Sequence, residues 1–261
     1  MKLTHALPIL AIFVPFAFAS PAAAQESRWS VTPYVWMPNI DGNLNFQLPS
    51  GIRPEVGVGP NDYLENLDMA LMIAGDYHGD GWSIFTDLIY LDFSNENASV
   101  RTVSGPGPIQ IPIDVGSQVN FKGALWTLGG GYQLLNTESY TVELLAGFRY
   151  LGAEAQLNWS LQGPLNQFPQ SGSVDTDEDI WDGIIGVRGE FRAGSWFFPY
   201  YADVGAGSSD LTLQASAGVG YRFGSWDIRG VYRHLRYEQG DDKLINDLTF
   251  SGPALGATFR F

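Results

Sequence analysis

The sequence predicts an all-β protein, an antiparallel up-and-down transmembrane β-barrel of ten strands, with eight or twelve strands as alternatives. Three observations favour it: the pattern of the last eleven residues, an alternation of short turns with long loops, and aromatic residues at one end of every predicted hairpin. In Ser251–Phe261 the apolar residues Leu255, Ala257, Phe259 and Phe261 alternate with small or polar ones. A period of two indicates a strand with one apolar face, which suits the closing strand of a barrel that meets lipid.

Residues 1–24 are predicted to be a secretory signal peptide, and residues 25–261 the barrel domain. Lys2 precedes an apolar run at 7–19, and three alanines at 22–24 precede the expected cleavage site. The run is shorter than the ~20 residues of a helical span, which disfavours a membrane anchor.

Composition agrees with one large β domain that is exported. The chain has 31 Gly, 14% aromatic and 16% charged residues, and no Cys, so disulfides and cysteine metal sites are excluded. The formal net charge of −14 lacks the basic footprint of a nucleic-acid-binding protein.

The first five strands carry apolar residues at alternate positions between turn-forming residues. They are expected at residues 28–46, 67–78, 82–100, 115–135 and 140–160. The first bends at 38–42, where Pro and Gly interrupt pairing. Loops at 47–66 and 104–112 hold Pro and Gly that block strand pairing, whereas 79–81 and 136–139 are tight turns.

The last five strands follow the same pattern. They are expected at residues 179–192, 195–206, 211–223, 226–237 and 248–261. The strand from Leu211 to Phe223 has the most regular alternation. Polar loops at 162–178 and 238–247 precede the first and the last of these strands.

Short turns and long loops alternate along the chain. Long loops follow strands one, three, five and nine, and short turns follow strands two, four, six and eight. This asymmetry is typical of bacterial outer-membrane barrels with both termini in the periplasm. The connection after strand seven, at 207–210, is the exception because it is short on the outer side.

An aromatic residue stands at each short-turn edge, which predicts a girdle at the membrane interface. Its residues are Trp29, Tyr77, Trp82, Tyr132, Tyr140, Phe191, Trp196, Phe223, Trp226 and Phe259. A soluble β-sandwich, the alternative, has no need for aromatic residues at one end of every hairpin.

The segments VTPYVWMPNIDGNL, VYRHLRYEQ and LTFSGPALGATFRF resemble a family of uncharacterised proteobacterial outer-membrane β-barrel proteins, small and porin-like. Members are similar in a "TPYLW-P-G-DG" opening, a "GYRYL" strand and a terminal "GP-LG--FRF". The resemblance implies outer-membrane lipid and lipopolysaccharide as surroundings and insertion by the barrel-assembly machinery, with Phe261 as part of the signal. It implies no activity, and His234 stands where the family pattern usually has Tyr.

The predicted inward positions hold seven acids and seven arginines. They are Asp76, Asp87, Glu143, Arg149, Asp182, Arg188, Glu190, Arg192, Asp203, Arg222, Asp227, Arg229, Arg233 and Arg260. Arginine grips carboxylates with two parallel hydrogen bonds, which suits a confined ion-pair network. A ten-stranded barrel is narrow. The charges therefore predict either a structural plug, with Arg188 and Arg192 paired to Glu190 and Asp182, or a constricted pore selective for small ions or solutes.

The predicted function is an integral outer-membrane barrel of Gram-negative bacteria, acting as a monomer in a structural role or as a narrow passive pore. Surface recognition or adhesion through long acidic extracellular loops is the main alternative. An outer-membrane hydrolase is the alternative that the sequence favours least. No enzyme activity, cofactor or metal is expected.

Two pairs of residues are candidates for a hydrolytic site, which requires a base within hydrogen-bond reach of a nucleophile. Asp76 and His78 resemble the Asp/His groups of omptin proteases but fall at the periplasmic turn instead of the outer rim. His234 and Ser251 compare with the His and Ser of lipid A deacylases, but His234 is followed by Leu-Arg-Tyr instead of a Ser, and Ser251 lies too far along the chain to match that pattern.

Overall fold

The computed structural model describes residues 28–44, 53–58, 67–95, 103–104, 115–161, 171–239 and 245–261. The predicted signal peptide and most of the predicted loop at 104–112 lie outside these residues. In the described part of the chain every regular element is a β-strand. No helix there is long and apolar enough to cross a membrane.

The described residues form thirteen strands, from two to 23 residues long, and three of them exceed twenty residues. They are β1 (Trp29–Trp36), β2 (Asn39–Leu44), β3 (Arg53–Val58), β4 (Leu67–His78), β5 (Trp82–Asn95), β6 (Val103–Ser104), β7 (Val115–Asn136), β8 (Tyr140–Leu161), β9 (Ser171–Ala193), β10 (Trp196–Gly207), β11 (Leu211–Arg222), β12 (Trp226–Glu238) and β13 (Ile245–Arg260).

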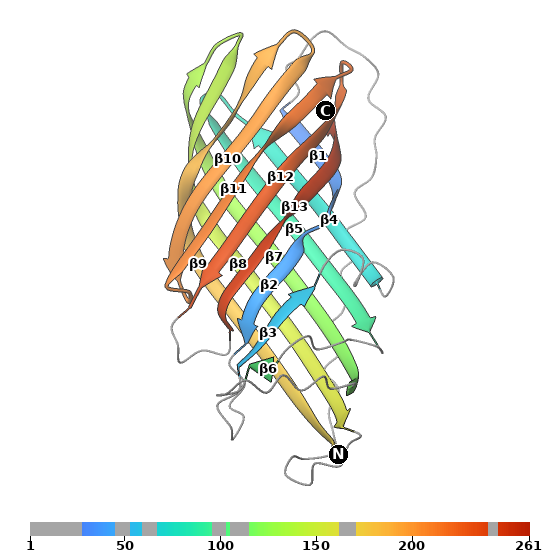
Figure 1. The fold of residues 1–261 in the computed structure, drawn as a ribbon. Coiled ribbons are helices and arrows are strands. Elements are labelled where there is room, and N and C mark those ends of the chain that lie inside the picture. The colour runs from blue at the N-terminus through green and yellow to red at the C-terminus, as the bar shows by residue number, and fades with distance from the viewer. Residues whose placement is uncertain are drawn as a thin grey trace, which may run out of the picture.

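Ten of these strands close into an antiparallel barrel. Their order is β1, β4, β5, β7, β8, β9, β10, β11, β12 and β13, and β13 pairs back to β1 (Figure 1). The amide of Trp29 and the carbonyl of Phe261, 3.3 Å apart, tie the two ends of the ring together. The predicted ten-stranded up-and-down barrel is therefore confirmed.

The first predicted strand is divided in two where a bend was expected. Met37 and Pro38 separate β1 from β2, and Gly252 on β13 lets this corner approach, because an added Cβ would stand 2.2 Å from the Met37 carbonyl. β1 pairs with β4 from Trp29 to Pro33, whereas β2 pairs with β3. The Trp36 amide donates to the Met72 sulfur at 3.0 Å, so the β1–β4 ladder has ended at this level.

Three predicted boundaries are wrong for one physical reason. The predicted loop at 47–66 contains β3, the loop at 162–178 contains the start of β9, and the loop at 238–247 contains the start of β13. Polar, Pro and Gly residues indicated loops there, but a strand that leaves the lipid layer needs no apolar face. Pairing continues into these polar segments; Ser160 of β8, for example, lies opposite Ser171 of β9.

Short turns connect the strands at one end of the barrel, which we call the short-turn end; the opposite end is the long-loop end (Figure 1). Gly81, Gly194 and Gly224 occupy three of these turns with φ of 80°, 63° and 94°. These conformations favour glycine because it has no Cβ. The turns keep the hairpins tight and in register.

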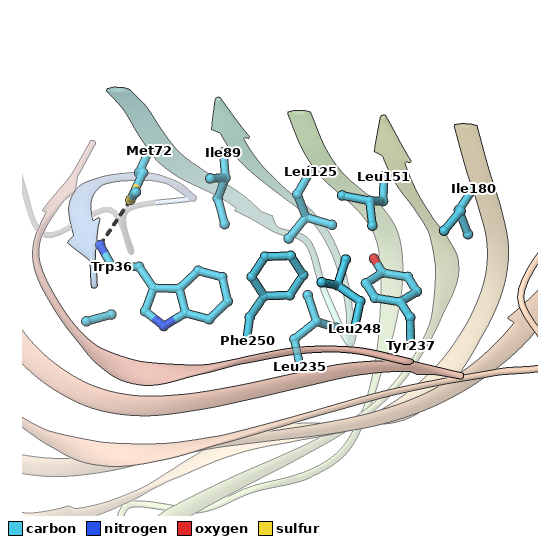
Figure 2. Packing of buried hydrophobic residues seen from close by; sticks show 11 residues of the cluster. Trp36, Met72, Ile89, Leu125, Leu151, Ile180, Leu235, Tyr237, Leu248 and Phe250 are labelled. Atoms are coloured by element: carbon cyan, nitrogen blue, oxygen red, sulfur yellow. Dashed lines mark hydrogen bonds between the residues drawn. The ribbon is translucent and has the colours of Figure 1, made fainter. Parts of the chain in front are cut away.

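The barrel wall has an apolar exterior and a mixed interior. Leu255, Ile185 and Tyr232 are among the exposed outward residues, while their neighbours in sequence point inward and are mostly buried. In the half toward the long loops, apolar side chains from opposite walls fill the interior (Figure 2). This apolar layer consists of Trp36, Met72, Ile89, Leu125, Leu151, Ile180, Leu235, Tyr237, Leu248, Phe250 and Ala254.

Candidate functional site

The candidate functional site is the barrel interior, where the predicted charges form five clusters on the short-turn side of the apolar layer. Thirteen of the fourteen predicted residues take part in ion pairs with one another. Asp182 is the exception: it accepts hydrogen bonds from the amide and hydroxyl of Ser209, at 2.9 and 2.6 Å. Its carboxylate therefore fixes the 208–210 connection at the long-loop end.

Arg188 organises the first cluster. Its Nε donates to Glu143 Oε2 and its Nη1 to Asp76 Oδ1, both at 2.6 Å, and its Nη2 donates to Ser83 at 3.0 Å. The guanidinium also lies 4.4 Å above the centre of the Phe85 ring. Because β9 carries Arg188 and β4 carries Asp76, this cluster links walls that are four strands apart.

Glu190 forms the second cluster with Arg192 and Arg222. Arg192 Nε donates to Glu190 Oε1 at 2.7 Å, and Arg222 contacts the same oxygen. The expected partnership of Arg192 with Glu190 is present, but neither Arg188 nor Arg192 meets Asp182, so that part of the expected plug is wrong. Residues two apart on one strand share a face, which is why Arg192 reaches Glu190.

The third cluster surrounds Asp227 at the short-turn end. Arg260 of β13 and Arg229 of β12 both reach its carboxylate, the latter at 3.5 Å. Asp227 is fully buried, with 0% of its surface exposed. A buried carboxylate requires such partners because burial without them carries a large desolvation cost.

Arg149 and Asp203 form the fourth cluster, and both side chains are 0% exposed. Arg149 Nη1 donates to Asp203 Oδ1 at 3.1 Å while Nη2 reaches the second oxygen, so the pair is bidentate. The hydroxyl of Tyr201 donates to Asp203 at 2.5 Å, and Arg149 also contacts Thr212 at 3.2 Å. Every oxygen of the carboxylate thus has a donor.

The fifth cluster joins Arg233 of β12 to Asp87 of β5 across the interior, at 2.7 Å. Tyr34 donates to Asp87 at 2.5 Å, and Arg233 donates to Gln214 at 2.8 Å. The Arg233 guanidinium lies 4.6 Å from the centre of the Trp36 ring, which belongs to the apolar layer. This cluster therefore connects the charged region to the apolar layer.

The apolar layer lies next to these clusters, on their long-loop side, since Leu151, Ile180 and Leu235 occupy the inward positions next to Arg149, Asp182 and Arg233 on their strands. Ile89, Leu125, Leu151 and Ile180 come from consecutive strands of one wall and face Phe250, Leu235, Leu248 and Tyr237 of the other (Figure 2). Leu235 and Tyr237 are fully buried. Charge reasoning overlooked this layer, although its members could have been found as the apolar residues at inward positions of the same strands.

The predicted girdle residues lie on the outer surface at the short-turn end. Cross-strand registers join them directly: Trp29 lies opposite Tyr77, and Trp82 opposite Tyr132. The Trp29 and Tyr77 rings are 4.6 Å apart, and Phe223 stacks on Trp226 at 4.4 Å. The remaining members, Tyr140, Phe191, Trp196 and Phe259, are likewise exposed at strand ends, as is the terminal Phe261.

A second aromatic belt, which sequence reasoning missed, crosses the outer surface of β5, β7, β8 and β9 at the level of the apolar layer, and we call it the long-loop belt. Its members are Tyr90, Trp126, Phe148, Tyr150 and Trp181. Phe148 and Trp181 have ring centres 5.5 Å apart, and Tyr150 and Trp181 4.6 Å. On β9, Trp181 is ten residues from Phe191. This separation is about 33 Å along the strand. Because the strands of such barrels are tilted by ~40° from the barrel axis, it is about 25 Å along that axis, which is the height of an outer-membrane apolar band.

The structure also brings together two residues that sequence reasoning kept apart. His234 of β12 lies opposite Ser251 of β13, and His234 Nδ1 is 2.6 Å from Ser251 Oγ. The sequence spacing does not match the deacylase pattern, but the register of the β12–β13 hairpin places the two residues side by side. Asp76 and His78 do lie at the short-turn end of β4, where Asp76 pairs with Arg188.

No family model and no curated protein matches the chain. Solved structures do: the outer membrane protease OmpT of Escherichia coli superposes with a TM-score of 0.52 at 9% identity, covering 93% of this chain and 99% of that one. The translocator domain of the autotransporter NalP of Neisseria meningitidis gives 0.44 at 15% identity, covering 91% and 90%. Ail of Yersinia pestis gives 0.37 at 13% identity, covering 91% and 100%. At these identities the chain shares the fold of bacterial outer-membrane β-barrels, and the likeness extends to the fold alone.

Proposed function

We propose that this chain is an integral barrel of the bacterial outer membrane whose interior is closed, and that its role is structural rather than conductive. The observation that carries this proposal is a double obstruction. Charged clusters bridge opposite walls, and the buried apolar layer crosses the interior on the long-loop side of these clusters. Apolar constrictions stop ion flow by excluding water, and paired arginines and carboxylates leave few free charges for an ion to meet.

The apolar layer and the outward belts support the proposed location. On β9 the two aromatic belts are about 25 Å apart along the barrel axis, the height that outer-membrane barrels present to lipid. Lipid and lipopolysaccharide are the proposed surroundings, a monomer is the proposed state, and the barrel-assembly machinery is the proposed partner, with Phe261 as part of its signal.

Conductance of the refolded barrel tests the proposal. The mature chain, shown to be folded by its heat-dependent shift on a gel, is placed in a planar bilayer under a salt gradient. We expect no conductance steps. A Leu235→Gly/Phe250→Ala variant, which removes two members of the apolar layer, serves as a comparison and is expected to leak. Steady steps with a defined reversal potential from the unchanged barrel would contradict the proposal and favour a narrow selective pore.

Surface recognition is the second candidate, and one observation favours it. Beyond the long-loop belt, β7, β8 and β9 continue as a paired three-stranded sheet; β9 extends ten residues from Trp181 to Ser171. Such a projection adds nothing to a lipid-spanning wall. It would present a rigid surface to the outside of the cell.

A further inference from the structure

The outer surface of the barrel carries a row of polar side chains on three neighbouring strands. His234 of β12 lies opposite Ser251 of β13, and Ser251 lies opposite Asn39 of β2. Residues flanking His234 and Ser251 in sequence, such as Leu235 and Phe250, point into the apolar layer, so the row faces outward. His234 Nδ1 and Ser251 Oγ are 2.6 Å apart, within hydrogen-bond distance.

If the barrel lies in the membrane as proposed, the row lies near the long-loop edge of the band that faces lipid. His234 is eight residues from Trp226 of the short-turn girdle, about 26 Å along β12 and about 20 Å along the tilted barrel axis. The exposed Tyr232 precedes it on the same face. On β13 the outward residues change from Leu255 and Pro253 to Ser251 at this level. The carboxylic esters of membrane lipids lie at the same depth.

We infer that His234, Ser251 and Asn39 form a hydrolytic site for acyl esters of lipids in the leaflet on the long-loop side. Ser251 is the nucleophile, His234 its general base, and the Asn39 amide a donor to the oxyanion. A serine is activated by an adjacent base within hydrogen-bond reach, and an asparagine side chain can supply an oxyanion donor. This inference depends on the proposed membrane location but not on the closed interior.

The reaction balances without any added reagent except water. Ser251 Oγ attacks the ester carbonyl carbon while its proton passes to His234. The carbonyl oxygen, carrying the negative charge, accepts a hydrogen bond from Asn39. The C–O bond to the alcohol breaks, and His234 protonates the departing alkoxide. Water then attacks the acyl-serine, His234 takes its proton and returns it to Ser251, and a carboxylic acid leaves.

The site has two members in contact rather than three. In the described part of the chain, the only histidine and carboxylate within 4.0 Å of each other are His78 and Glu143. Among the described residues, no carboxylate orients His234. A pair of this kind suits a substrate that is held in place by the lipid layer and delivered at high local concentration, since positioning supplies much of the rate.

A serine-directed fluorophosphonate and an ester substrate test the inference on the full mature barrel in phospholipid vesicles. We expect the probe to label Ser251, identified by peptide mass, and fatty acid to be released from a vesicle-embedded fluorogenic acyl ester. Ser251→Ala and His234→Ala should lower both signals at least tenfold, and Asn39→Ala should slow both ester release and labelling, because the phosphoryl oxygen of the probe takes the place of the oxyanion. Thr249→Ala is the matched control, because this hydroxyl lies on the same strand and face two residues away, and it should leave both signals unchanged.

Two results would overturn the inference. If the folded barrel takes no label and releases no fatty acid, His234 and Ser251 are only a mutually satisfied polar pair. If a soluble nitrophenyl ester is cleaved while the vesicle-embedded ester is not, the pair is reactive but lipid is not its substrate. Either result leaves the conductance experiment, and with it the proposed closed barrel, unaffected.

Discussion

At the scale of single residues, the interior is stabilised by pairs whose members depend on each other. Arg149 and Asp203 are both fully buried and bidentate, with Tyr201 and Thr212 supplying further hydrogen bonds. Removing one member of a buried pair leaves an uncompensated charge, whereas replacing both by apolar residues of similar volume is often neutral. The pair thus tests whether the clusters act mainly as structure.

We expect Arg149→Met to lower the free energy of unfolding by about 3–5 kcal/mol, because Asp203 is left charged and buried. The double variant Arg149→Met/Asp203→Leu should recover most of that loss. Reversible unfolding in urea, followed by tryptophan fluorescence in detergent or lipid, measures both. A double variant as unstable as the single one would show that the polar partners, rather than the charge, dominate this cluster.

At the scale of the strands, the outward face decides how each element sits in lipid. Ile185 of β9 is 65% exposed and lies between the two belts, four residues from Trp181 and six from Phe191. Leu134 of β7 is 49% exposed but lies past Tyr132 at the short-turn end, outside the apolar band. Substitutions at these two positions therefore compare two depths along the barrel for residues that are both exposed.

Arginine at these positions should therefore have different costs. Ile185→Arg is expected to lower the unfolding free energy in lipid by about 2–4 kcal/mol, the cost of a cation near the middle of the bilayer, and Leu134→Arg by about 0–1 kcal/mol. Urea titrations in lipid vesicles measure both. Equal costs at the two sites would mean that the band between the belts does not face lipid.

The same strands show what the sequence could and could not predict. Alternation and turn residues were sufficient for the ten-stranded ring and for the side on which each predicted charge lies, because a period of two assigns faces directly. Partners were harder: Arg188 finds Asp76 four strands away, and Asp182 binds Ser209 instead of an arginine. Such contacts depend on barrel shear and curvature, which no single strand encodes.

The site on the outer surface illustrates the same limit. His234 and Ser251 are 17 positions apart, and only the register of the β12–β13 hairpin places them opposite each other. Without that register, separation in sequence was a poor guide to distance. Likewise, the polar starts of β9 and β13 resemble loops until their pairing is known.

At the scale of the whole molecule, the barrel divides into a body between the two aromatic belts and the projecting sheet of β7, β8 and β9. The body holds the five charged clusters and the apolar layer, whereas the projection lies beyond the long-loop belt. Glu154 and Asp177 are partners across β8 and β9. A two-residue Asn-Gly turn joined between them would therefore shorten this hairpin without changing the register below it.

We expect a variant in which residues 155–176 are replaced by Asn-Gly to fold, because Leu151, Ile180 and the Arg149–Asp203 pair all remain in place. β7 keeps its pairing with β5, from Asn95 opposite Val119 onward. The unfolding free energy of the shortened variant should lie within about 1 kcal/mol of that of the parent barrel, as for a surface change away from the core. If the projection serves recognition, binding to whole cells should disappear while ester release and labelling at Ser251 persist. A variant that fails to fold would instead make the projection part of the body and remove the structural basis for a separate recognition surface.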